Sequence, residues 1–366
     1  MTILGIDHVE FYVGDLEKSA AVLCRGFGFR AGAALPSSPG CAAPGGPAGP
    51  GGAPAAGSQS TLLRQGRIKL LLTAASASGH PAADFVQRHG DGVASIAFRT
   101  DDVRQAFEAA VAGGAQAIAA PVFAECEGRL VGQAVVSGFG DVTHRLVEHD
   151  ERAGDEGSAG RREDELLEAL DHAAICVRPG QLEAVVRFYR EAFGFTHTFD
   201  ERIEVGGQAM ISKVIQDRAG AVTFTLLEPD PEREPGQIDQ FLIAHCGAGV
   251  QHLALRTPDI VGAVRTLSGR GVEFLAAPAG YYRSLEGRLG AFPIPVDVLR
   301  EVNVLADRDQ WGRLFQIFSH STHERRTFFF ELIERQGART FGTGNIRALY
   351  EALYEEQTPR FHDGDG

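Results

Sequence analysis

Residues 92–100 read Gly-Val-Ala-Ser-Ile-Ala-Phe-Arg-Thr, and residues 249–257 read Gly-Val-Gln-His-Leu-Ala-Leu-Arg-Thr. Both stretches have the apolar character of a strand that is buried in a sheet. Each is followed by a helical pattern that ends in glycines, at residues 113–114 and between residues 269 and 271. The recurrence predicts that the chain uses one strand–helix–strand unit more than once.

A second pair of stretches extends the repeat. Residues 6–13 (IDHVEFYV) are followed by a helix-like stretch and then by Phe-Gly-Phe at 27–29. Residues 170–177 (LDHAAICV) are followed in the same way by Phe-Gly-Phe at 193–195. The unit therefore occurs four times, two per half, which predicts a duplicated domain of class α+β.

Composition suggests where the two halves meet. Residues 150–164 are charged, contain glycine and show no apolar periodicity, so we expect a linker between an N-terminal domain, 1–150, and a C-terminal domain, 165–366. Residues 31–57 are almost entirely Ala, Gly, Pro and Ser, which predicts a mobile surface loop outside any active site. Residues 345–356 have helical spacing and could form a helix that closes over a site.

Charge and composition exclude several classes of function. The formal charge of −13 disfavours binding to nucleic acid or to an anionic membrane surface, both of which select basic patches. No apolar run reaches the length of a membrane-spanning helix, and the N-terminus lacks the pattern of a secretory signal. The five cysteines are scattered and form no CxxC motif, which is typical of reduced thiols in a cytoplasmic protein.

Two histidines and one glutamate in the second half carry the chemistry. His172, His252 and Glu331 each lie inside a short apolar run that reads as a buried strand. Burying such groups without a partner costs several kcal/mol each, on the order given by transfer data, so a shared partner is expected. Two histidines and one carboxylate are the ligand set of non-haem Fe(II) sites, which keep coordination positions open.

The first half supplies an internal comparison. His8 corresponds to His172, and Glu148 is the approximate counterpart expected for Glu331. Ser95 stands where the second half has His252. Because two ligands would hold iron poorly, we expect the first half to bind no metal and to serve as a scaffold.

Four runs of the second half resemble a known family. They are GVQH at 249–252, GRLFQIF at 312–318, FFFELIER at 328–335 and GTGNIRALY at 342–350. The two halves resemble vicinal-oxygen-chelate modules, in which paired βαβββ units curl into an open barrel around a metal. The second half resembles the 4-hydroxyphenylpyruvate dioxygenases and their sister enzymes, the 4-hydroxymandelate synthases. The resemblance covers nearly the whole chain and places the iron ligands at the same three residues.

The resemblance implies a reaction. The expected substrates are 4-hydroxyphenylpyruvate and O₂, the expected cofactor is Fe(II), and oxidative decarboxylation would release CO₂. Attack on the ring then gives homogentisate, whereas hydroxylation of the benzylic carbon gives 4-hydroxymandelate, expected as the S isomer and as a precursor for peptide antibiotics. A homodimer is a further expectation.

Two positions favour the benzylic product. Ring-attacking members of the family carry Phe in a Gly-Asn-Phe motif, where this chain has Ile346, and Pro on an earlier strand, where it has Thr225. Both departures resemble the mandelate synthases. The resemblance also implies that further residues face the substrate: Ser212, Gln251, Gln316, Phe318 and Tyr350. Strand alternation would turn Gln251 away from its neighbour His252, so a structural role is the alternative for that residue.

Other functions remain open at this stage. A homogentisate-forming dioxygenase is the nearest alternative, since fold, metal and substrate would be the same. A glyoxalase-like isomerase or an extradiol ring-cleaving enzyme would use the same module but has no support in the four runs. A ligand-sequestering resistance protein of this fold would generally lack the metal ligands, so iron content separates that class from the enzymes.

Overall fold

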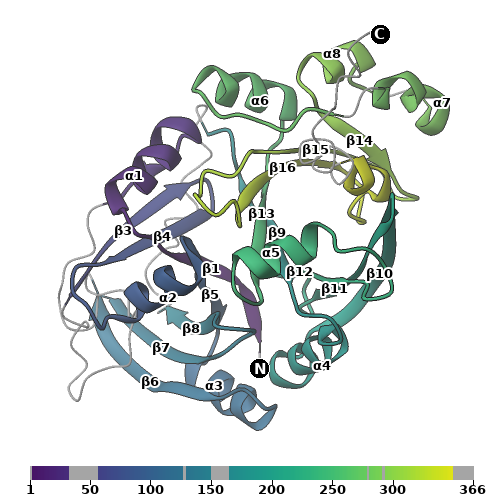
Figure 1. Ribbon diagram of the computed structural model, residues 1–366. Coiled ribbons are helices and arrows are strands. Elements are labelled where there is room, and N and C mark those ends of the chain that lie inside the picture. The colour runs from purple at the N-terminus through teal and green to yellow at the C-terminus, as the bar shows by residue number, and fades with distance from the viewer. Residues whose placement is uncertain are drawn as a thin grey trace, which may run out of the picture.

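The computed structural model describes residues 2–32, 57–126, 129–149, 165–277, 280–290 and 293–348. It is an α+β structure with two eight-stranded mixed sheets, one in each half of the chain. Figure 1 shows the strands of the C-terminal half, teal to yellow, curled into an open ring beside the N-terminal half, purple to blue. The predicted linker at 150–164 and most of the predicted loop at 31–57 lie outside the described residues.

The N-terminal half contains the first eight strands. Its elements are β1 (Ile3–Tyr12), α1 (Leu16–Ala21), the π-helical η1 (Val22–Gly26), β2 (Arg30–Ala31), β3 (Ser58–Gln65), β4 (Ile68–Ala75), α2 (Pro81–His89), β5 (Gly92–Thr100), α3 (Val103–Ala112), β6 (Ala117–Cys126), β7 (Arg129–Ser137) and β8 (Thr143–His149).

The C-terminal half repeats this order with additional helices before β14. Its elements are β9 (Ala169–Cys176), α4 (Leu182–Phe193), β10 (Thr196–Val205), β11 (Gln208–Gln216), β12 (Thr223–Pro229), α5 (Gln237–Ala244), β13 (Gly249–Arg256), α6 (Ile260–Gly269), the 3-10 helix η3 (Tyr281–Ser284), α7 (Leu285–Leu289), α8 (Val296–Glu301), β14 (Leu305–Arg308), β15 (Arg313–Phe318) and β16 (Phe329–Gln336).

The two sheets have the same topology. Their strand orders are β2-β3-β4-β1-β5-β8-β7-β6 and β10-β11-β12-β9-β13-β16-β15-β14. In each half the first and fourth strands of a βαβββ unit pair in parallel, and the two units join through an antiparallel pair, β1 with β5 or β9 with β13. The predicted duplication of βαβββ modules is therefore confirmed.

Matching residues begin the helices that follow β5 and β13. Asp102 caps α3 by accepting hydrogen bonds from the backbone amides of residues 104 and 105, and Asp259 caps α6 through the amide of Gly262. Glu148 on β8 accepts from the amide of Val103, and Glu334 on β16 accepts from the amide of Ile260. These bonds satisfy amides that a helix start leaves unpaired, which explains why both repeats read Thr-x-Asp before the helix.

One hydrophobic core runs through both halves. Phe11 of β1 packs edge-on against Phe328, with ring centroids 5.0 Å apart, and Phe27 packs against Phe330 at 4.9 Å. A buried polar contact crosses the same interface, because His144 of β8 and the Tyr189 hydroxyl of α4 lie 2.7 Å apart. The halves are thus held together by aromatic packing and by a hydrogen bond that is fully shielded from water.

The C-terminal end of the described chain turns back onto the second sheet. Residues 343–348 are helical, which agrees with the start of the helix expected at 345–356, and the remainder of that helix lies outside the described residues. Within the described parts of the chain, no helix has the length and apolar character needed to cross a membrane.

Candidate metal centre

Three adjacent strands bring the triad together. Ala254 of β13 is the partner of His172 on β9 and also the partner of Glu331 on β16, and His252 lies two residues earlier on β13. A bulge between Val250 and His252 sets the register there. Since partners across a sheet project from the same face, the three polar side chains converge over the small Ala254.

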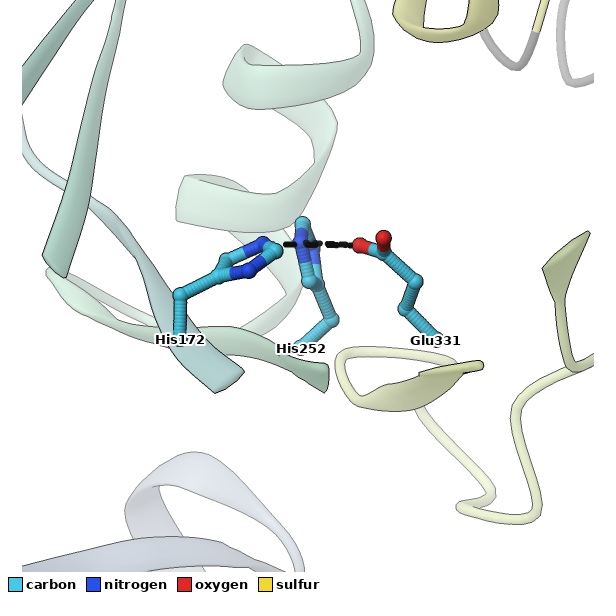
Figure 2. A group of neighbouring side chains, drawn as sticks. All are labelled: His172, His252 and Glu331. Carbon is cyan, nitrogen blue, oxygen red and sulfur yellow. Dashed lines mark ion pairs between the residues drawn. The ribbon is translucent and has the colours of Figure 1, made fainter. Parts of the chain in front are cut away.

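The geometry of the triad is compact. One ligand atom from each of the three residues lies within 4.8 Å of the others. The Nε2 atoms of His172 and His252 each lie 3.4 Å from Oε2 of Glu331. Figure 2 shows both imidazoles aimed at this carboxylate, and their rings stand at 80° to each other. All three residues are buried, with 3%, 8% and 1% of their surface exposed, respectively.

An outer layer of hydrogen bonds orients each member of the triad. His172 Nδ1 lies 3.0 Å from Asp171 Oδ1, and His252 Nδ1 lies 3.2 Å from Gln251 Oε1. Both oxygens only accept, so Nδ1 of each ring carries a proton and Nε2 is the nitrogen that faces the centre and would bind a metal. Gln316 Nε2 donates to the other carboxylate oxygen of Glu331 at 2.8 Å.

The electrostatics of the triad follow from burial and mutual charge. Burial acts to lower the pKa of His172, but the carboxylates of Glu331 and Asp171 outweigh it and raise that pKa to about 9. Burial acts to raise the pKa of Glu331, but the two imidazoles lower it to about 2. Burial is the main cause that lowers the pKa of His252. The site therefore keeps an ionised carboxylate in a dry interior, where it attracts a cation strongly.

The donor set fits a divalent iron. Two imidazole nitrogens and one carboxylate oxygen lie within 4.8 Å of one another, so the triad would supply three ligand atoms to one ion. That arrangement is typical of non-haem Fe(II) sites, which bind a substrate and dioxygen beside the protein ligands. The three residues that would hold the metal are His172, His252 and Glu331.

The structure places Thr225 and Ser212 on neighbouring strands of the same barrel. Thr225 of β12 pairs with Ala174 on β9, and Ala174 also pairs with His252. Thr225 pairs on its other side with Val214 of β11, two residues from Ser212. Both hydroxyl residues are buried, and Thr225 Oγ1 has no hydrogen-bond partner among the described residues. Thr225 therefore offers an unused polar atom beside the triad.

Gln251 and Gln316 lie closer to the metal ligands than the sequence indicated. The Gln251 side chain contacts the Nδ1 atom of His252, although strand alternation was expected to turn it away from that residue. Gln316 Nε2 donates to both the Glu331 carboxylate and the carbonyl of Phe341, and Gln316 Oε1 accepts a hydrogen bond from Asn345 at 2.8 Å. In this arrangement both amide groups of Gln251 and Gln316 support the triad.

Aromatic and aliphatic side chains line the rest of the barrel interior. Phe318 pairs with Glu331 across the strands, and its ring centroid lies 6.3 Å from that of His252. Ile346 is partly buried and packs against the cluster of apolar residues that contains Phe318 and Ala174. Tyr350 lies outside the described residues.

Several residues of the centre were not anticipated from sequence. Phe329 stacks on His252 with ring centroids 5.0 Å apart, and Phe341 packs edge-on against His172 at 4.8 Å. Asp171 binds both His172 and the guanidinium of Arg335. The position of Asp171 directly before a ligand is a usable signal, whereas nothing in the sequence pattern connects Arg335 with a residue so far upstream.

Among its described residues, the N-terminal half has no equivalent triad. The register confirms that His8 corresponds to His172, because His8 pairs with Ala97 as His172 pairs with Ala254. The expected pairing of Glu148 with Glu331 is wrong: Ala97 pairs on its other side with Arg145. Glu148 instead corresponds to Glu334, and both cap a helix. The first half therefore presents His8, Ser95 and Arg145 where the second presents the triad.

The chain is similar to proteins of one superfamily. The sequence model described as "Glyoxalase/Bleomycin resistance protein/Dioxygenase superfamily" matches residues 5–131 and 169–287. A 4-hydroxyphenylpyruvate dioxygenase of Coccidioides posadasii (strain C735) is 31% identical over 97% of this chain and 94% of its own length. One from Dictyostelium discoideum is 30% identical over 97% of this chain and 99% of its own length.

The chain is also similar to solved structures of this kind. A triple mutant of 4-hydroxymandelate synthase from Streptomyces coelicolor superposes with a TM-score of 0.84 and 41% sequence identity, over 98% of this chain and 100% of that one. A xylose isomerase-like TIM barrel/4-hydroxyphenylpyruvate dioxygenase fusion protein superposes with a TM-score of 0.71 and 25% identity, over 97% of this chain and 53% of that one.

Proposed function

The chain belongs to the 4-hydroxyphenylpyruvate dioxygenase and 4-hydroxymandelate synthase family of the glyoxalase superfamily, and on that premise we propose that it is a 4-hydroxymandelate synthase. The proposed reaction converts 4-hydroxyphenylpyruvate and O₂ into (S)-4-hydroxymandelate and CO₂. Both atoms of O₂ enter the organic product, one in the new hydroxyl group and one in the carboxylate formed from the keto carbon, while the original carboxylate leaves as CO₂, so no further reductant is needed. Supply of hydroxyphenylglycine for peptide antibiotics is the corresponding proposed role.

The observation that carries the proposal is the buried triad of two histidines and one glutamate. Bound Fe(II) would supply a redox centre with open positions for a chelating 2-oxo acid and for dioxygen. The residues of this chain would hold that metal, keep both Nε2 lone pairs aimed at it through Asp171 and Gln251, and exclude water from the site.

The barrel interior suits an aryl substrate. Phe318 and Phe329 stand beside His252, and an apolar cluster continues from them across the barrel. Thr225 adds a buried hydroxyl group, on the face shared with the triad, that has no hydrogen-bond partner in the described parts of the chain. A ring held by apolar contacts and one polar group can be fixed at a single angle, and displacement of reacting atoms by about 1 Å changes rates strongly.

Two observations support the benzylic product. The 4-hydroxymandelate synthase structure shares 41% identity with the chain, whereas the dioxygenase relatives share 30% and 31%. Ile346 and Thr225 occupy the positions at which the sequence departs from ring-attacking enzymes, and Ile346 packs on the apolar cluster of the barrel. The smaller aliphatic side chain leaves room for a different tilt of the substrate ring than a Phe side chain would.

A homogentisate-forming 4-hydroxyphenylpyruvate dioxygenase is the second candidate. It is favoured by the curated relatives, which carry that name and align with almost the whole chain. It would use the same metal ligands, the same 2-oxo acid and the same oxygen chemistry. The two candidates differ in which carbon of the substrate receives the hydroxyl group.

Product identification separates the candidates. The protein is loaded with Fe(II) under ascorbate, given 4-hydroxyphenylpyruvate in air, and its products are separated by chiral liquid chromatography against standards of homogentisate and both 4-hydroxymandelate isomers. We expect (S)-4-hydroxymandelate. Homogentisate as the main product would reject the synthase and support the second candidate, and loss of substrate consumption after iron chelation serves as the control for metal dependence.

A further inference from the structure

One guanidinium group connects a proposed metal ligand with the end of the described chain. Arg335 Nε and Nη2 donate to the carboxylate of Asp171 at 2.8 to 3.1 Å, and Asp171 in turn accepts from His172 Nδ1. Arg335 Nη1 donates to the carbonyl oxygens of Thr340, at 2.6 Å, and Ala338, at 3.4 Å. The planar fork of an arginine allows these contacts on two sides at once.

The same stretch of chain, residues 338–346, touches the triad at two further places. The Phe341 ring packs edge-on against His172 at 4.8 Å and lies 5.2 Å from the Arg335 guanidinium. The Phe341 carbonyl accepts from Gln316 Nε2, which also donates to Glu331, and Asn345 Nδ2 donates to Gln316 Oε1. Residues 338–346 therefore contact the surroundings of both His172 and Glu331.

The N-terminal half repeats part of this arrangement without the triad. There Asp7 lies 2.7 Å from His8 Nδ1 and 2.8 Å from His149 Nε2, and His149 stands at the position of Arg335. A carboxylate between the strand histidine and a basic residue is thus common to both halves, including the half without the triad. In the second half, Arg335 also donates to the carbonyls of residues 338 and 340, whose first-half counterparts lie outside the described residues.

We propose that Arg335 is a positioning residue for the metal centre that couples His172 to residues 338–346. Through Asp171 it holds the imidazole in the orientation that ligates a metal, and through the two carbonyls it holds the segment that carries Phe341 and Asn345. Coupling of this kind is reciprocal, so metal binding orders the segment to the same extent that the ordered segment favours metal binding. The inference rests on the proposed iron centre.

The test uses Co²⁺ as a spectroscopic substitute for iron and compares three full-length variants, Arg335→Gln, Arg335→Lys and the control His149→Gln. Each metal-free protein is titrated with Co²⁺ while its visible absorption is recorded. Loss of an outer-shell partner typically weakens metal binding about 10- to 100-fold, which is the effect expected for Arg335→Gln together with a changed cobalt spectrum. The control removes a partly exposed ion-pair partner and should bind Co²⁺ within about twofold of the unaltered protein.

Hydrogen exchange gives the second readout. In the unaltered protein, Co²⁺ should slow amide exchange at residues 339–346, where several amides donate to Asp309, Asp307 and Gly342. Arg335→Lys keeps a cation for Asp171 but lacks the fork that reaches both carbonyls. It should therefore retain Co²⁺ affinity better than Arg335→Gln and yet lose the metal-dependent protection. This variant decides the question if Arg335→Gln fails to fold.

The outcomes are distinct. Equal Co²⁺ affinity and equal spectra for the unaltered protein and Arg335→Gln would overturn the proposed coupling, and so would an equal loss in His149→Gln. Metal-dependent protection that persists in Arg335→Lys would also overturn it. A His252→Ala variant is titrated in the same way. If it binds Co²⁺ as tightly as the unaltered protein does, the triad does not bind the metal, and both the iron centre and the coupling are rejected.

Discussion

At the scale of single residues, the charge of Glu331 sets the properties of the centre. It supplies the one negative charge among the three triad residues, and it lies 3.4 Å from the Nε2 atom of each histidine. The carboxylate is nearly inaccessible to water, so its attraction for a cation is poorly screened. Gln316 fixes one of its oxygens and leaves the other between the imidazoles.

Removal of this carboxylate should abolish the metal site. Glu331→Ala deletes one ligand, and we expect metal affinity to fall by more than about 100-fold, beyond the range typical of outer-shell changes, with turnover lost in parallel. Metal titration and oxygen consumption measure the two effects. Glu334→Ala is the matched control on the same strand, because Glu334 caps α6 and should cost about 1 kcal/mol of folding stability while leaving metal binding intact. Normal turnover in Glu331→Ala would contradict the triad.

Ile346 is the residue at which the product should be decided. Ile346→Phe adds a ring to a partly buried position beside the apolar cluster of the barrel, so it should tilt the substrate ring and divert product toward homogentisate or uncouple oxygen consumption from product formation. Chromatographic product ratios and oxygen stoichiometry measure the change. Ile243→Phe makes the same substitution at an exposed position of α5 and should leave the ratio unchanged. An unaltered ratio in Ile346→Phe would remove the role proposed for this side chain.

The sequence allowed the three members of the triad to be predicted, because each is a polar residue flanked by apolar ones in a recurring strand. It could not predict the role of Gln251, since the bulge at Val250 and His252 changes the direction in which neighbouring side chains project. Nor could it predict Arg335, whose partner Asp171 lies on a distant strand. Long-range pairs of this kind become visible only when strand order and register are known.

At the scale of elements, β8 and β16 show how a small offset changes the function of a strand. Each strand carries a glutamate that accepts from the first amide of a helix, Glu148 for α3 and Glu334 for α6. Glu148 is therefore the counterpart of Glu334, although the sequence alone suggests Glu331. The counterpart of Glu331 is Arg145, which is buried and forms an ion pair with Glu10 at 3.4 Å. A fixed cation at this place opposes metal binding through direct charge repulsion.

The register therefore predicts one metal ion per chain. His8→Ala should leave the metal content of the loaded protein unchanged, because the N-terminal half presents Ser95 and Arg145 instead of a ligand pair. His172→Ala should reduce that content to a small fraction, since it removes a member of the triad. Elemental analysis after anaerobic loading and gel filtration gives both values, and a loss of metal in His8→Ala would show that the first half also binds.

At the scale of the whole molecule, the interface between the halves contains a buried neutral histidine. His144 Nδ1 donates to the carbonyl of Ile96 at 3.1 Å, so Nε2 of the neutral ring accepts from the Tyr189 hydroxyl at 2.7 Å. Burial lowers the pKa of His144 to about 4. The unfolded chain, with an ordinary histidine pKa of about 6.5, binds more protons than the folded one between these values.

Acid should therefore lower the free energy of unfolding. The contribution of His144 is present in full above about pH 6.5 and is lost as the pH falls toward 4, by on the order of 3 kcal/mol. The double variant His144→Phe with Tyr189→Phe removes both partners and should flatten this part of the pH profile, which urea unfolding at several pH values measures. Burial also lowers the pKa of His245 to about 4, so His245 makes the same pH-dependent contribution to the free energy of unfolding in the unaltered protein and in the double variant. An unchanged profile would assign the acid sensitivity to groups outside the pair.

The distribution of the triad over β9, β13 and β16 also has a consequence for synthesis on the ribosome. These strands are neighbours in the sheet, yet the chain supplies them one after another, and the glutamate is supplied last. A nascent or truncated chain that ends before Glu331 can contain a folded first half and most of the second without the complete ligand set. Products that lack Glu331 are thus unable to assemble the proposed metal centre, so its chemistry is confined to chains in which all three strands have been synthesised.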